Sequence, residues 1–193
     1  MKRYCLYLFI LIGISCSAEL KAQKNGTVYK GNDPAVRYTG RTLVSPDGSV
    51  AFDWVGTYLE TRFTGGRLSV KVSETGTSYY NVFVDGKLHK VVKVCGTDTL
   101  IHLVSGIDKR IHSLKIQKRS EGEFGKTTVH QFVLSGSGRL AKEPAVRTRH
   151  IEFIGNSLTC GYGTDGKHRD EPFLVETENC NLTFASMVAR YYD

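Results

Sequence analysis

Apolar and polar residues alternate with a period of two over much of the stretch from residue 36 to about residue 140. In the segment 67–73, for example, Leu68, Val70 and Val72 fall on one side of an extended chain and the polar residues between them on the other. This alternation is typical of strands that are buried on one face. Strands are therefore expected over residues 57–63, 67–73, 79–84, 88–94, 99–104, 112–118 and 128–134.

Turn signals separate these expected strands. They lie at residues 47–48, 64–66, 85–86, 105–106 and 120–122, and each contains glycine. The pair Asp85-Gly86 joins two apolar runs and predicts a two-residue hairpin, because that turn needs positive φ at both central residues. About seven to nine short strands with turns between them favour a β-sandwich, here a jelly roll over residues 36–140. A segment of this length can bury its own core.

The pattern changes after Gly138. Residues 141–149 are expected to form a linker, and the apolar run His150–Ile154 predicts a strand that leads into a turn. A polar loop follows, and the apolar stripe within residues 179–192 predicts a helix that Asn179 or Asn181 caps. A strand, a turn and a helix are the beginning of an α/β domain, so residues 150–193 are expected to be an incomplete one.

This incomplete domain leaves part of the predicted helix without a partner. Its stripe includes Leu182, Val188 and Tyr192, and one strand–helix unit cannot cover both faces of a parallel sheet. Exposed apolar side chains of this size favour local disorder or aggregation. We therefore expect residues 23–138 to fold alone, and residues 155–193 to be mobile unless further chain follows.

The first 22 residues have the form of a secretory signal peptide. Lys2 and Arg3 precede an apolar run that is too short to span a bilayer, and small residues follow it. Cleavage is expected after Ala22, with Ala18 as an alternative, and Cys16 leaves open a lipoprotein anchor. The processed chain would then begin with an N-terminal arm, residues 23–35, have no membrane span, and be secreted or periplasmic.

Charge and aromatic content narrow the possible partners only slightly. Removal of residues 1–22 lowers the formal net charge from +7 to +5, because three basic residues and one acidic residue are lost. The remaining basic residues are scattered, which argues against nucleic acid as a partner. One group of them is expected to form a solvated face: Lys109, Arg110, Lys115, Lys118 and Arg119. The aromatic residues Trp54, Tyr58, Tyr79 and Tyr80 are either core residues or a platform for a sugar.

Three of the five cysteines remain after processing: Cys95, Cys160 and Cys180. An odd number does not define a disulfide framework, but export permits one bond, and Cys160–Cys180 is a possible pair. Cys95 is expected to be a buried free thiol at the end of an apolar strand. Spacings typical of metal ligands do not occur, and the histidines at strand positions (His89, His102, His112 and His130) are expected to be structural.

The turn after the expected strand His150–Ile154 presents Ser157. Gly155 allows a tight turn at the carboxyl edge of the strand, and Asn156 precedes the serine. A serine at such a turn exposes its hydroxyl, and nearby backbone N–H groups can stabilise an oxyanion. The chemistry also needs a base that accepts the serine proton.

The string FIGNSLTCGYG, residues 153–163, resembles the first signature block of the SGNH (GDSL-type) hydrolases, in the form found in carbohydrate esterase family 2. Members of this family join an N-terminal jelly roll to an SGNH domain and remove acetyl groups from polysaccharides and sugars. The N-terminal half is similar too, in the strings YTGRT (38–42), FDWVGTYLETRFTG (52–65), YYNVFVDGK (79–87) and KRSEGEFG (118–125).

The resemblance implies that Ser157 is the nucleophile and that its own N–H is one oxyanion donor. The family usually has Asp where this chain has Asn156, whose amide can accept similar hydrogen bonds. The later Gly and Asn donors and the catalytic His of the family would lie beyond Asp193, in the missing remainder of the SGNH domain. Asp165 and His168 have the spacing of the family's Asp-x-x-His motif but come too early, so His168 is expected to be a solvated loop residue.

The sequence therefore predicts an exported carbohydrate acetylesterase, present as an N-terminal fragment that is inactive alone. Its partner would be an acetylated polysaccharide or sugar, and no cofactor or metal is implied. The alternative is a non-catalytic β-sandwich that acts as a carbohydrate-binding or packing module. A histidine and further oxyanion donors downstream of Ser157 would distinguish the esterase from the binding module.

Overall fold

The structure is a computed structural model that describes residues 26–141 and 148–192. The predicted signal peptide lies outside the described residues, as does most of the predicted linker. The strands are β1 (Gly26–Lys30), β2 (Val36–Thr39), β3 (Leu43–Val44), β4 (Val50–Phe52), β5 (Tyr58–Val84), β6 (Lys87–Lys118), β7 (Thr127–Ser135) and β8 (Leu140–Ala141). The helices are α1 (Ser157–Cys160) and α2 (Phe184–Tyr191), with short 3-10 turns η1 (Gly122–Phe124), η2 (Val175–Thr177) and η3 (Cys180–Leu182).

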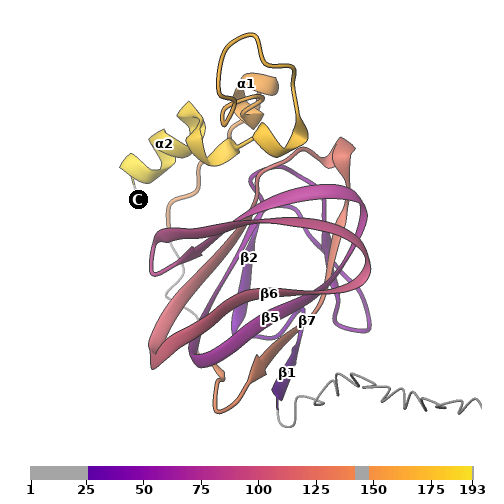
Figure 1. Ribbon diagram of the computed structural model, residues 1–193, viewed down its shortest axis with the longest axis vertical. Coiled ribbons are helices and arrows are strands. Elements are labelled where there is room, and N and C mark those ends of the chain that lie inside the picture. Colours follow the sequence, from indigo (N-terminus) through magenta and orange to yellow (C-terminus); the bar gives the residue numbers. More distant parts are fainter. Residues whose placement is uncertain (1–25, 142–147, 193) are drawn as a thin grey trace, which may run out of the picture.

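The strands form one curled antiparallel sheet that closes into the predicted jelly-roll sandwich (Figure 1). β5 pairs with β2, β6, β7 and β8, and β7 also pairs with β1 and β4. The predicted N-terminal arm, residues 23–35, contributes β1 to this sheet, because Gly26–Lys30 pairs with residues 131–135 of β7. The mainly β fold class is therefore confirmed.

Six of the predicted strands merge into the two long strands β5 and β6. The glycines expected to end strands instead bend them: Gly66 and Gly106 have φ of 93° and 72°, and the β5–β6 register shifts around Gly66. The positive φ that glycine permits accommodates such an irregularity within a continuous strand. The Asp85-Gly86 hairpin is confirmed, with φ of 51° and 76° at its two residues.

The core lies between the two layers, and its residues follow the predicted alternation. Leu68, Val70 and Val72 are all buried, as are Phe63 and Phe132. Cys95 differs from the prediction, because it is an exposed free thiol. Its neighbour Val94 is buried, and since successive strand residues point to opposite faces, Cys95 must face outward.

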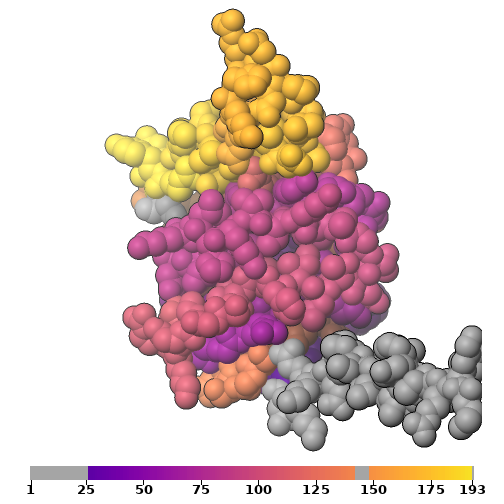
Figure 2. Space-filling view, viewed as in Figure 1, coloured from indigo at the N-terminus to yellow at the C-terminus, as the bar shows by residue number. Residues whose placement is uncertain are grey.

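Residues 148–192 lie as a cap over one end of the sandwich (Figures 1 and 2). The predicted helix is present but shorter, because residues 180–182 form η3 and only Phe184–Tyr191 is α-helical. The predicted strand His150–Ile154 is wrong: this segment has no ladder partner among the described residues, and an isolated strand leaves its backbone unpaired. As expected, the apolar stripe within residues 179–192 is not fully covered, since Leu182, Val188 and Tyr192 are 41%, 40% and 54% exposed.

Among the described residues, no helix is long and apolar enough to cross a membrane.

His112 is buried and hydrogen-bonds to Asp85 and Asp108. These contacts make the free energy of unfolding depend on pH. Its Nδ1 lies 2.7 Å from Asp85 Oδ2 and its Nε2 3.0 Å from Asp108 Oδ1. The Asp85 hydrogen bond is the main cause that raises the pKa of His112, while burial opposes it. A raised pKa means that protonated His112 stabilises the fold fully below its ordinary pKa, and that this contribution is lost as pH rises through the folded value.

We therefore expect His112→Gln to destabilise the protein more at about pH 5.5 than at about pH 9, on either side of the ordinary histidine pKa. Urea unfolding of both proteins at both pH values measures this difference. Exposed His89 provides the control variant His89→Gln, which should have only a small effect on stability. An equal loss at both pH values for His112→Gln would contradict the charged form proposed here.

Candidate functional site

Ser157 is the first residue of α1, and Asn156 is its N-cap. The backbone of Asn156 is extended, with φ −111° and ψ −158°, and its Oδ1 accepts a hydrogen bond from Leu158 N at 3.1 Å. Asparagine is a preferred N-cap because its side chain satisfies one N–H of the first turn. Gly161 ends the helix in the left-handed conformation, with φ 90°. The sequence therefore builds a single helical turn with Ser157 at its start.

Gly155 has a steric role in this turn. A Cβ at position 155 would lie 2.0 Å from Thr159 Oγ1, closer than any real contact. The chain before α1 thus passes directly against the side chain of Thr159, and a larger residue at position 155 would force that side chain to move. Gly155 and Asn156 therefore both shape the turn before α1. That this turn supports catalysis stays a prediction.

The reactive groups of Ser157 are accessible. Ser157 is exposed, and within residues 26–141 and 148–192 its hydroxyl and its N–H make no hydrogen bond that would occupy them. A free N–H is expected in the first turn of a helix. The carbonyl of Ser157, by contrast, accepts from Gly161 N at 2.9 Å and from Tyr162 N at 3.1 Å. Ser157 therefore has an unoccupied hydroxyl and an unoccupied backbone N–H, and no base among the described residues hydrogen-bonds to the hydroxyl.

Arg119 holds the segment after α1 on the sandwich. Its side chain is 3% exposed. Nε donates to the carbonyl of Glu178 at 2.7 Å, and the guanidinium also donates to the carbonyl of Glu176 and to the Asp165 carboxylate. The prediction of a solvated face is wrong for Lys118 and Arg119, which are buried, although Lys109 and Arg110 are exposed.

An amide network extends this contact. Asn81 Nδ2 donates to Asn179 Oδ1 at 3.0 Å, and Asn179 Nδ2 donates to Asp165 Oδ2 at 3.0 Å. Asn179 N also donates to the carbonyl of Gly161 at 3.0 Å. Asp165 is thus occupied by Arg119 and Asn179, and His168 is exposed. The expectation that His168 is a solvated loop residue is confirmed.

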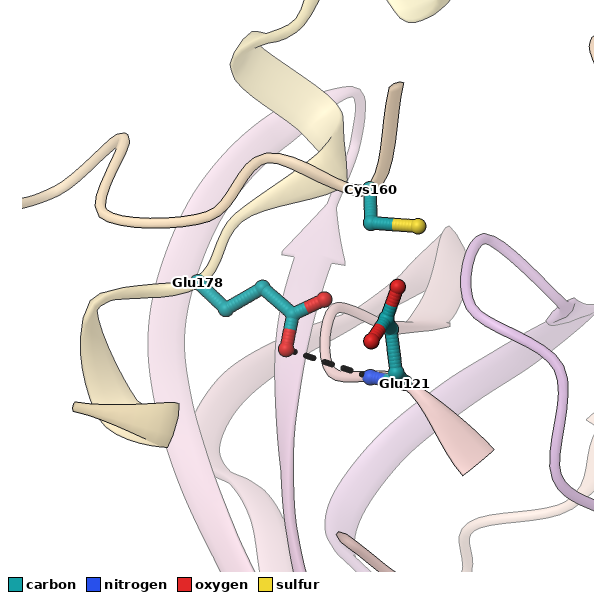
Figure 3. A group of neighbouring side chains, drawn as sticks. All are labelled: Glu121, Cys160 and Glu178. Carbon is teal, nitrogen blue, oxygen red and sulfur yellow. Dashed lines mark hydrogen bonds between the residues drawn. The ribbon is translucent and has the colours of Figure 1, made fainter. Parts of the chain in front are cut away.

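Glu121, Cys160 and Glu178 converge beside this network (Figure 3). One ligand atom from each lies within 4.8 Å of the others. Burial raises the pKa of Glu178 to about 7, and burial together with a hydrogen bond to Glu121 raises the pKa of Cys160 to about 12. Cys160 and Cys180 are both free thiols, so the disulfide considered for this pair is not formed in the structure.

Lys118 is a second buried cation near the cluster. Its Nζ donates to Ser78 Oγ at 2.7 Å and to the carbonyl of Glu121 at 3.4 Å. Burial lowers the pKa of Lys118 to about 8, against the attraction of nearby carboxylates. Lys118 is the last residue of the predicted strand 112–118 and Arg119 follows it, but strand periodicity alone does not reveal what would cover these two cations.

A cleft of about 940 Å³ lies between the cap and the sandwich. Trp54 and Tyr58 line it from the sandwich, and Gly155 and Cys160 from the cap. Trp54 is 58% exposed, with the guanidinium of Arg41 5.3 Å from its ring centroid.

The four aromatic residues considered as one platform do not lie together. Tyr80 is buried in the core, edge-on to Phe52. Tyr79 donates a hydrogen bond to Glu176 Oε2 at 3.2 Å. Only Trp54 and Tyr58 of the four line the cleft.

Known proteins are similar to this chain in sequence and in fold. Residues 38–144 match the model of the family described as Carbohydrate esterase 2 N-terminal. The cellulase/esterase CelE of Acetivibrio thermocellus is 33% identical over 159 residues, which are 82% of this chain and 19% of that protein. An acetylxylan esterase / glucomannan deacetylase of Cellvibrio japonicus is 30% identical over 135 residues, 69% of this chain and 37% of that protein.

Comparison with solved structures indicates the same family. A family two carbohydrate esterase from Clostridium thermocellum, in complex with cellohexaose, has a TM-score of 0.77 and 33% identity, with 81% of this chain and 48% of that chain covered. This chain therefore spans less than half the length of these relatives. Because the family model matches more than half of the chain, and because relatives and fold agree with it, the chain belongs to the carbohydrate esterase 2 N-terminal family.

Proposed function

We propose that this chain is the N-terminal part of an exported carbohydrate acetylesterase in which Ser157 is the nucleophile. The substrate would be an O-acetylated hemicellulose or its sugars, in keeping with the acetylxylan esterase and glucomannan deacetylase named among its relatives. Export rests on the signal peptide predicted for residues 1–22.

The observation that carries this proposal is the geometry of Ser157. Its hydroxyl is exposed at the start of α1, and its N–H is not used by any hydrogen bond of the described chain. Gly155 and Asn156 fix the turn, and the Arg119 network attaches the following segment to the sandwich. A rigid support of this kind is what a nucleophile needs, because misplacement by about 1 Å can cost about a hundredfold in rate.

The reaction would take place in two steps. A base removes the proton of Ser157 Oγ, the oxygen attacks the acetyl carbonyl carbon, and the Ser157 N–H donates to the oxyanion that forms. The sugar oxygen leaves with a proton, and an acetyl ester of Ser157 remains. Water then hydrolyses this ester and releases acetate. In this proposal the histidine base and the remaining oxyanion donors come from sequence that follows residue 193, and the chain alone is inactive.

The test compares acetate release from acetylated xylan by three proteins. These are the product of the complete reading frame that contains this chain, the same product with Ser157→Ala, and residues 1–193 alone. Activity is expected only in the first. Full activity of the Ser157→Ala protein would refute the proposal.

The cleft favours a second candidate function, the binding of a glycan without hydrolysis. Trp54 presents an exposed ring on the cleft wall, and Tyr58 lies on the same wall. An aromatic ring with one open face is suited to stack on a sugar ring. A relative of known structure binds cellohexaose, so this oligosaccharide is a suitable probe.

We expect Trp54→Ala to weaken cellohexaose binding by more than about tenfold, because truncation of a central aromatic contact costs about 2 kcal/mol or more. Isothermal titration calorimetry on the full chain measures the change. Ile111→Ala is the control, since Ile111 is an exposed apolar residue that does not line the cleft. Equal affinity of the Trp54→Ala and wild-type chains would remove Trp54 from the binding site.

A further inference from the structure

We propose that Glu121, Cys160 and Glu178 form a binding site for a divalent zinc-type cation that fastens the α1 segment to the sandwich. The three residues come from separate parts of the chain. Glu121 immediately precedes η1, Cys160 is the last residue of α1, and Glu178 follows η2. Nothing in this inference depends on whether Ser157 is catalytic.

The geometry of the three side chains fits a metal. Their candidate ligand atoms lie within 4.8 Å of one another, and the sulfur and the two carboxylates lie beside one another (Figure 3). Zinc bonds to sulfur and carboxylate oxygen at about 2.0–2.3 Å, which places its tetrahedral ligands roughly 3–4 Å apart. The Glu121 and Cys160 side chains are half-buried. Small rotations of these side chains would bring the ligand atoms from within 4.8 Å of one another to the separation that zinc needs.

Glu178 supplies an independent indication that a ligand is needed. The residue is 0% exposed, and its Oε1 has no hydrogen-bond partner among the described residues. Its other oxygen, Oε2, accepts from Glu121 N at 3.2 Å, and Figure 3 shows that the unpartnered oxygen is on the side of Cys160. A buried carboxylate oxygen without a partner is costly, and a cation at the centre of the cluster would satisfy it.

The surrounding charges match a divalent ion. With all three ligands ionised, as a bound metal requires, two carboxylates and a thiolate would carry three negative charges. Lys118, whose Nζ donates to the Glu121 carbonyl, supplies positive charge that also acts on Glu74 and Asp53. The other cation, Arg119, is already paired with Asp165. Negative charge would therefore be in excess in the ionised cluster, and a divalent cation or protons would offset it. Further groups beside it are Glu123, Tyr162 and Cys180.

The ligand set favours zinc over calcium or magnesium. Cysteine is a ligand for zinc and other borderline or soft metals, whereas calcium and magnesium take oxygen. Tyr162 OH donates to Glu121 Oε2 at 3.0 Å, and such an outer hydrogen bond orients a metal ligand. Three protein ligands would leave a fourth position for water.

Cobalt is the probe for this site, because a thiolate bound to Co²⁺ gives a charge-transfer band in the near ultraviolet. We expect the reduced full chain to bind one equivalent of Co²⁺ with this band, and Zn²⁺ to displace it. The band should be lost in Cys160→Ser and strongly weakened in Glu178→Gln, but retained in the controls Cys95→Ser and Cys180→Ser. Zn²⁺ should also slow alkylation of Cys160 at least tenfold in the wild type, as read by mass spectrometry of the Cys160 peptide.

Three results would overturn the proposal. The first is the absence of a one-to-one band together with unchanged alkylation of Cys160, which would mean that protons neutralise the cluster. The second is a band that persists in Cys160→Ser, which would place the metal elsewhere. The third is a Cys160–Cys180 disulfide in protein exported under native conditions, because an oxidised sulfur cannot act as the thiolate ligand. If Cys160→Ser does not fold, Glu178→Gln and the alkylation rate still decide.

Discussion

Replacement of Ser157 by alanine is expected to abolish acetate release by the complete protein, with a fall in kcat on the order of 10⁴–10⁶-fold. Loss of the nucleophile in serine hydrolases has effects of this size, because only binding and oxyanion stabilisation remain. The substitution removes a single exposed oxygen that makes no hydrogen bond within the described residues. The fold should therefore be unchanged, and KM should change much less than kcat.

Steady-state kinetics on acetylated xylan measure this prediction, with circular dichroism to confirm the fold. Ser105→Ala is the matched control, because Ser105 is also an exposed serine but lies on a bend of β6, and this variant should keep full activity. A decrease below about tenfold for Ser157→Ala would mean that another residue attacks the ester.

The sandwich was predictable because short sequence patterns determine its strands and its hairpin turn. Alternation at Leu68, Val70 and Val72 places them in the core, and the positive φ that Asp85-Gly86 permits sets the hairpin. The same patterns do not distinguish a glycine that ends a strand from one that bends it. That choice depends on whether partner strands continue past the glycine, as β6 does beside Gly66, and this is a long-range property.

The position of Ser157 was likewise predictable, but its surroundings were not. Gly155 and Asn156 are the two residues before the serine and form a recognisable turn. Arg119 and Glu178 lie 38 and 21 positions away in the sequence, and no spacing rule relates them to the turn. The apolar run before Ser157 predicted a strand, yet strand formation requires a neighbour that the described residues do not supply.

Substitution of Arg119 by methionine is expected to release residues 148–192 from the sandwich while the sandwich stays folded. Arg119 is buried, although the Asp165 side chain is 34% exposed. Hydrogen bonds to charged groups contribute about 1.5–3 kcal/mol each, so loss of the contacts of Arg119 with Asp165, Glu176 and Glu178 is expected to cost about 3–5 kcal/mol. The substitution would leave Asp165 without its cation, and the carbonyls of Glu176 and Glu178 would lose their donors. Since α2 exposes most of its apolar stripe, burial of this helix cannot compensate for the loss.

Hydrogen exchange distinguishes release of the cap from global unfolding. The amide of Asn179, which bonds to Gly161 O, should lose protection by about 10²–10³-fold or more, as 3–5 kcal/mol implies. The core amides of β5 and β7 should change little. Arg110→Met is the control, because Arg110 is an exposed arginine that pairs with Asp108 at the surface, where ion pairs contribute little.

The same experiment tests the expectation that residues 155–193 are mobile when they have only the sandwich as support. If the amide of Asn179 is already unprotected in the wild-type chain, the Arg119 contacts do not hold the cap by themselves, and α2 needs apolar cover that the described residues do not supply. Suppose instead that this amide is protected in the wild type and loses its protection in Arg119→Met. Then the Arg119 contacts position the turn of Ser157 without apolar cover over α2. The serine would then be held by the sandwich, which gives the β domain a direct part in the geometry of the proposed active site.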